Sequence, residues 1–77
     1  MVDYFQPAEV ECYSGQRFGE QPRSFCWQGK RYLVERIEKE WLEPGQRYFW
    51  VLTKDDSHFE LVYNEQQENW EAVQLVG

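Results

Sequence analysis

The stretch from Arg47 to Tyr63 most constrains the fold of this chain, because its pattern is that of two strands joined by a polar turn. The first strand is bulky on both faces. One face carries Tyr48, Trp50 and Leu52. The other carries Phe49, Val51 and Thr53. The second strand alternates, with Phe59, Leu61 and Tyr63 on one face. Strands that are apolar on both faces are typical of a sheet centre, so this stretch predicts the central hairpin of a small curled sheet.

Four further segments have the composition or alternation of strands and are separated by glycine or proline. They are Ala8 to Tyr13, Arg23 to Trp27, Lys30 to Trp41 and Trp70 to Val76. In the last, either Trp70 and Ala72 or Val73 and Leu75 face inward, depending on the register. The pattern predicts an all-β fold: a small curled antiparallel sheet or an SH3-like barrel of five to six strands. We expect a single domain over residues 1–77, with residues 1–7 as a leader that packs Tyr4 and Phe5 on the domain or stays loose.

The segment from Lys30 to Trp41 has two interpretations. Leu33, Ile37 and Trp41 recur at helical spacing, and opposite charges stand four residues apart. As a strand, Tyr32 and Val34 alternate correctly, but Ile37 and Trp41 need a slip of one residue. A β-bulge near Glu35–Arg36 would supply that slip and bend the strand. The preceding turn at Gln28-Gly29 favours the bent strand over residues 30–41, with a helix as the alternative.

A chain of 77 residues buries only about 60–65% of its unfolded surface, so its core needs reinforcement. Aromatic side chains make up 18% of the residues and are the obvious source. Cys12 and Cys26 are expected to be reduced thiols, with a disulfide between them as the less favoured alternative. We expect no signal peptide, no membrane-spanning segment and a cytoplasmic location, because no long apolar run or basic leader is present.

Candidate catalytic and metal-binding residues are few. His58 is the only histidine and has no ligand-spaced partners, so it is interpreted as a solvent-facing strand residue beside a turn. The pair Asp55-Asp56 has the character of a hairpin turn. Neither a phosphate-binding glycine loop nor a nucleophile motif is present. We therefore expect a protein that is not an enzyme and that has no catalytic residue, metal or cofactor.

Basic and aromatic residues alternate along the hairpin of residues 23–32, and this pattern allows two interpretations. Exposed rings beside Arg23, Lys30 and Arg31 would bind single-stranded nucleic acid. Alternatively, Phe25, Trp27 and Tyr32 form the core face. The second interpretation is favoured because so small a core needs its rings. The net charge of −6 also disfavours nucleic acid as a partner.

The central strand suggests a different surface, because only one of its two bulky faces can point into a small barrel. The other must be covered by residues 1–7, by the loop of residues 14–22, by a second copy or by a partner. We therefore predict a protein-binding or self-association surface at Trp41, Tyr48 and Trp50.

Spaced aromatics and a glycine give the chain a resemblance to a known family. The pattern is Pro22-x-x-Phe25-x-Trp27-x-Gly29-x-x-Tyr32-x-Val34, followed by Trp41, Arg47, Phe59-x-Leu61 and Trp70. It resembles a small uncharacterised bacterial domain family that also occurs as a C-terminal appendage of Y-family DNA-polymerase-like proteins of translesion synthesis. The resemblance implies a recruiting or protein-contact role linked to DNA repair. The chain departs from it at Asp55-Asp56-Ser57, where an Asp-Gly turn is expected.

Overall fold

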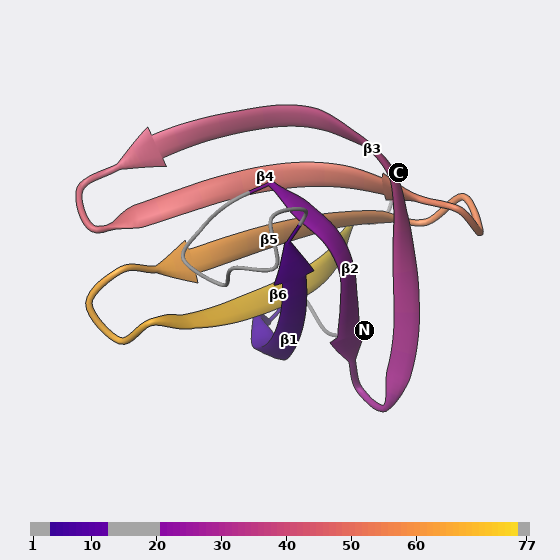
Figure 1. Cartoon of the computed structure of the whole chain (residues 1–77), viewed down its shortest axis with the longest axis horizontal. Coiled ribbons are helices and arrows are strands. Elements are labelled where there is room, and N and C mark those ends of the chain that lie inside the picture. The colour runs from indigo at the N-terminus through magenta and orange to yellow at the C-terminus, as the bar shows by residue number, and fades with distance from the viewer. Residues whose placement is uncertain (1–3, 13–20, 76–77) are drawn as a thin grey trace.

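The fold is built from strands alone in the computed structural model, which describes residues 4–12 and 21–75. The strands are β1 (Gln6–Cys12), β2 (Pro22–Trp27), β3 (Lys30–Glu43), β4 (Gln46–Thr53), β5 (His58–Asn64) and β6 (Asn69–Leu75). All pairings are antiparallel and follow the chain order, and β1 also pairs with β6 to close a barrel (Figure 1). The predicted all-β barrel of the SH3-like kind is confirmed, and residues 30–43 are a strand and not a helix.

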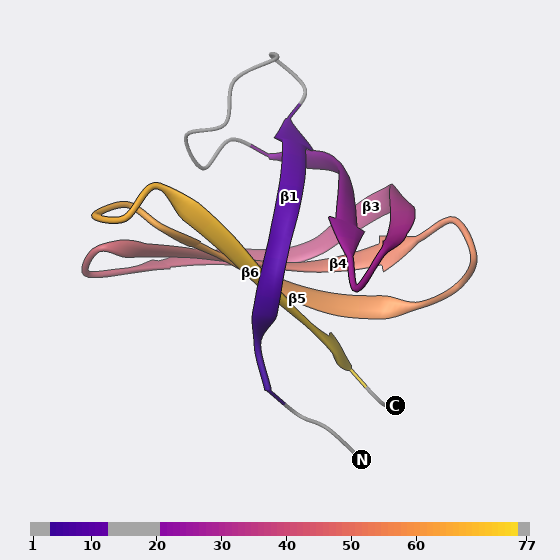
Figure 2. The same ribbon diagram turned by 90° about the horizontal axis from the view of Figure 1, so that it is seen from below.

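The barrel has strands of two directions. Figure 2 shows β1 running steeply across the flat layer formed by β4, β5 and β6. The two directions are joined by β3, which pairs with β2 through residues 30–33 and with β4 through residues 34–43. β3 therefore belongs to both parts of the sheet. Its bend turns the sheet so that β1 can pair with β6 and close the barrel.

Four aromatic rings fill one part of the core. Phe59 is 0% exposed and lies 4.9 Å from Phe25, 4.7 Å from Tyr32 and 5.1 Å from Trp27 between ring centroids. The indole N–H of Trp27 donates to the carbonyl of Ala72, at 2.9 Å, so this ring is also tied to β6. Since Phe25 and Tyr32 are buried, the expectation that the rings of this hairpin form the core face is confirmed.

A second group of rings lies where β4, β5 and β6 meet. The Trp70 ring is 5.7 Å from Phe49 and 5.1 Å from Tyr63. Trp70 and Ala72 are therefore the inward residues of β6, which settles the register that the sequence left open. On β4 the inward residues are Phe49, Val51 and Thr53, which are at most 2% exposed. This strand lies between β3 and β5, as predicted for a central strand.

Two β-bulges bend β3. The first lies between Val34 and Arg36, where the sequence predicts it, and the second lies between Ile37 and Lys39. Each places one extra residue on β3, so residues 34–43 pair with residues 46–53, ten residues against eight. Ile37 packs against the core as a result of the first bulge. The second bulge was not predicted, and it decides where Trp41 points.

Several boundaries differ from those predicted. The first strand begins at Gln6, and Gln6 and Pro7 pair with β6, so part of the expected leader belongs to the barrel. Tyr4 and Phe5 are exposed. Tyr13 and most of the loop 14–22 lie outside the described residues. The two cysteines are not bonded to each other: Cys12 is buried and Cys26 is exposed.

The hairpin turns use the left-handed region of the backbone. Between β2 and β3, Gln28 has φ 51° and Gly29 has φ 79°, which is the predicted tight turn. Between β4 and β5, Asp56 has φ 68°. Aspartate is one of the few L residues that adopt such a φ. The β4–β5 hairpin therefore has a left-handed turn residue without a glycine.

Replacing Asp56 with glycine is expected to raise the stability of the protein. Glycine adopts φ 68° without the steric cost that a Cβ carries, so we expect a gain of up to about 1 kcal/mol. Urea denaturation followed by tryptophan fluorescence would measure it. Asp56→Ala is the matched control, because it removes the carboxylate and keeps the Cβ. Equal stability changes in the two variants would contradict this account.

Candidate functional site

Three aromatic residues form a cluster on the outer face of the β3–β4 hairpin. Trp41 pairs with Tyr48 across the two strands, and their rings are stacked with centroids 5.0 Å apart and planes 4° apart. The Trp50 ring stands against Trp41 edge to face, at 5.5 Å and 89°. Cross-strand neighbours on one face contact each other directly, so the strand register itself assembles these rings. We call Trp41, Tyr48 and Trp50 the outer cluster.

Polar and charged side chains hold the outer cluster in place. Lys39 pairs with Trp50 across the strands, and its Nζ lies 5.3 Å from the Trp41 ring and 5.2 Å from the Trp50 ring. The indole N–H of Trp50 donates to Glu60 Oε1 at 3.0 Å. The Tyr48 hydroxyl donates to Gln46 Oε1 at 2.9 Å. Each ring is thus held by at least one neighbour besides the other rings, which reduces the entropy lost when a partner binds.

The outer cluster is partly open to solvent, and buried apolar side chains share its face of the sheet. Trp50 is 36% exposed, and Trp41 and Tyr48 are half-buried. Val62 pairs with Tyr48, and Val73 pairs with Glu60, so both valines share the outer face. Yet they are only 6% and 8% exposed. The outer face therefore also carries buried apolar side chains that are not part of the barrel core cluster.

Two carboxylates give the cluster an acidic border. Burial raises the pKa of the Tyr48 phenol above its ordinary value, and the negative charges of Glu43 and Glu60 raise it further. The phenol therefore keeps its proton at neutral pH and acts as a hydrogen-bond donor. The cluster thus combines apolar ring surface with one cation between the rings and acids at its edge.

The second bulge explains why Trp41 belongs to this surface. Ile37 faces the core, and strict alternation would turn Trp41, four residues later, to the same side. The extra residue between Ile37 and Lys39 shifts the alternation, so that Trp41 pairs with outward-facing Tyr48. Sequence reasoning named the three rings but missed Lys39, Glu60, Val62 and Val73. The sequence does contain a signal for Lys39, because it stands two residues before Trp41 and therefore shares its face of the strand.

The predicted basic residues lie elsewhere, on β2 and β3 at the other hairpin. Arg23 is exposed. Lys30 pairs with Asp55 at 3.4 Å, and Arg31 lies 3.7 Å from Glu11. The structure thus separates the six predicted site residues into two groups, with Trp41, Tyr48 and Trp50 in one and Arg23, Lys30 and Arg31 in the other. In the second group, Lys30 and Arg31 already have acidic partners.

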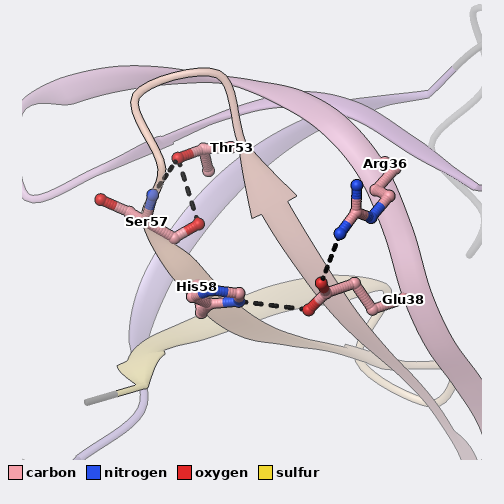
Figure 3. A network of polar contacts seen from close by, with 5 residues as sticks. All are labelled: Arg36, Glu38, Thr53, Ser57 and His58. Carbon is pink, nitrogen blue, oxygen red and sulfur yellow. Dashed lines mark hydrogen bonds and ion pairs between the residues drawn. The ribbon is translucent and has the colours of Figure 1, made fainter. Parts of the chain in front are cut away.

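His58 lies on the outer surface, as predicted. Its Nδ1 is 3.1 Å from Glu38 Oε1, and Glu38 Oε2 is 3.4 Å from Arg36 (Figure 3). The His58 side chain is 47% exposed, so the contact with Glu38 lies in solvent and not in a cleft. An exposed pair of this kind contributes about 0–1 kcal/mol to stability.

The β4–β5 turn is fastened by the buried hydroxyl of Thr53. This hydroxyl accepts a hydrogen bond from the backbone N–H of Ser57 at 3.0 Å (Figure 3) and donates to the carboxylate of Asp55. The hydrogen bond from Thr53 lowers the pKa of Asp55 below its ordinary 3.8, and Lys30 acts in the same direction. The acidic pair at this turn therefore has the structural role that the sequence suggested.

Replacing Asp55 with asparagine is expected to flatten the acid side of the stability profile. A carboxyl whose folded pKa is lowered stabilises the fold above its ordinary pKa, and this contribution is lost as the pH falls through the folded value. The difference in unfolding free energy between the native protein and Asp55→Asn should be constant above about pH 5 and shrink below it. Urea denaturation at a series of pH values measures it, with Asp56→Asn as control. A difference that persists undiminished in acid would contradict this role.

Within residues 4–12 and 21–75, no group of three or more His, Cys, Asp or Glu side chains is arranged to hold a metal ion. The part of the chain that the structure describes has no helix long and apolar enough to cross a bilayer.

No family model, curated protein or solved structure matches this chain. The resemblance to polymerase-associated domains stays a prediction from the spaced aromatics.

Proposed function

We propose that this protein is a non-enzymatic interaction module that binds a protein partner through the outer cluster of Trp41, Tyr48 and Trp50. The observation that carries the proposal is that three rings are held together on the outside of a barrel whose core already contains Phe25, Phe59 and other rings. A domain this small needs its aromatic rings in the core, so three rings kept together on its surface indicate a binding surface.

The chemistry of the surface favours a protein over a nucleic acid. Tryptophan and tyrosine dominate the centres of protein interfaces, where rigid rings lose little entropy. Acids border the rings, with Glu60 bonded to Trp50 and Glu43 close enough to act on the Tyr48 phenol. Phosphates would be repelled there. Lys39 is the one cation placed over two of the rings in the described part of the chain, and it is engaged with both.

Site-specific photo-crosslinking tests the proposal in the native host. Tyr48 is replaced with p-benzoylphenylalanine, which has a similar ring and forms a covalent bond to whatever contacts it on illumination. We expect a discrete protein adduct. The same amino acid at Leu33, which is 47% exposed on the other hairpin, is the control and should give none.

A competition experiment tests whether the adduct depends on the outer cluster. Excess unlabelled native protein should abolish the adduct, whereas excess Trp41→Ala/Trp50→Ala protein should not. Crosslinks to nucleic acid, or equal adducts from positions 48 and 33, would overturn the proposal.

A further inference from the structure

Over most of its length, one edge of β3 is paired with no strand in the described part of the chain. Residues 30–33 pair with β2 and residues 34–43 pair with β4. Over residues 34–43, therefore, the edge that faces away from β4 is paired with no strand that the structure describes. Figure 1 shows this half of β3 as the outermost strand of the layer it forms with β4, β5 and β6. An edge of this kind exposes backbone N–H and C=O groups that can pair with another strand.

The first part of this edge is protected and the last part is not. Both bulges lie before Lys39, and bulges are one of the usual means of blocking edge-to-edge pairing. From Lys39 to Glu43 the strand pairs with β4 residue for residue. This regular stretch carries Trp41 on one face and Leu42 on the other, and Leu42 is 68% exposed. The part of the edge without bulges, Lys39 to Glu43, is therefore the part that can accept another strand.

The five residues of this stretch are complementary to themselves. Lys39, Trp41 and Glu43 share the outer face, because they pair with Trp50, Tyr48 and Gln46 on β4. If two copies meet antiparallel with Trp41 opposite Trp41, Lys39 of each copy lies opposite Glu43 of the other. Opposite charges placed directly across two strands are favourable, as are paired rings.

The ends of the stretch fix this register. The bulge between Ile37 and Lys39 interrupts the edge on one side, and the Pro44-Gly45 turn ends it on the other. Moving the symmetry axis by one residue to Glu40 would place Glu40 opposite Glu40, which is unfavourable. The arrangement centred on Trp41 is therefore the one that satisfies both charges.

We propose that a second copy of this chain pairs with the Lys39–Glu43 edge, so that two barrels form a symmetric dimer with a sheet continuous across β3. The outer clusters of the two copies then lie side by side on one face. This inference uses the edge of the strand and does not depend on the proposed function, which uses its outer face.

Sedimentation velocity over a range of protein concentrations tests the dimer. The native protein is expected to dimerise as its concentration rises. Lys39→Glu places Glu opposite Glu at both ends of the interface, and Glu43→Lys places Lys opposite Lys. Each single variant should weaken dimerisation by about tenfold or more. Mixing the two variants should produce a heterodimer, because every contact then regains opposite charges.

Matched controls come from the same strand and its neighbourhood. Lys54→Glu and Glu35→Lys change the net charge by the same amounts, and these two residues pair with each other at 3.6 Å outside the Lys39–Glu43 stretch. Both should dimerise like the native protein. A native protein that stays monomeric at millimolar concentration, a mixture that does not associate, or controls that disrupt dimerisation equally would each overturn the inference. In the crosslinking experiment at position 48, an adduct with the mass of two copies reports on the dimer, and an adduct of any other mass reports on the protein partner.

Discussion

Phe59→Ala is expected to cost the protein about 3–5 kcal/mol of folding free energy, as large buried rings do when they are truncated. Phe59 is 0% exposed and contacts the rings of Phe25, Tyr32 and Trp27. A chain of 77 residues has about 4–12 kcal/mol of total stability by the usual value per residue. One substitution would therefore remove a large share of the stability.

Urea denaturation monitored by far-UV circular dichroism measures this loss. Phe59→Leu keeps most of the volume and should cost much less. His58→Ala, at the neighbouring exposed position, should cost less than about 1 kcal/mol. If Phe59→Ala were as stable as His58→Ala, the four-ring group would not be the core of this fold.

The second large effect concerns binding. Trp41→Ala or Trp50→Ala is expected to lower the affinity for the crosslinked partner about 30-fold or more, which corresponds to the 2 kcal/mol of a central interface residue. The fold should persist, because both rings lie outside the barrel core and the outer ring contacts contribute only about 0.5–1.5 kcal/mol each.

Isothermal titration calorimetry with the purified partner measures the affinity, and thermal unfolding of each variant measures the fold. Leu33→Ala is the control, because it removes an exposed apolar side chain from the other hairpin. Unchanged affinity in both tryptophan variants would remove the outer cluster as a binding surface.

The barrel could be predicted because its strands alternate locally. Phe59, Leu61 and Tyr63 recur at every second position, and all three are buried. The need of a short chain for internal rings correctly placed Phe25 and Tyr32 in the core. These conclusions depend on neighbours in sequence or on composition, and both can be read without knowing which strands pair.

The details of the outer face could not be predicted, because they depend on which strands pair and in which register. The burial of Val62 and Val73 depends on the pairing of β5 with β4 and of β6 with β5, which sets their neighbours on the outer face. The direction of Trp41 depends on a bulge that has no glycine or other marker in the sequence. Strand register is a tertiary property, and a slip of one residue reverses every side chain that follows.

The ten-against-eight pairing of β3 and β4 has a consequence for changes in chain length. Deleting one residue from a strand without bulges reverses the direction of every side chain on one side of the deletion. β3 instead has two residues in surplus, Glu35 and Glu38, so losing either would leave Ile37 facing inward and Trp41 facing outward. Among related sequences, single-codon deletions should therefore be tolerated at these two positions and be rare in β4 or β5.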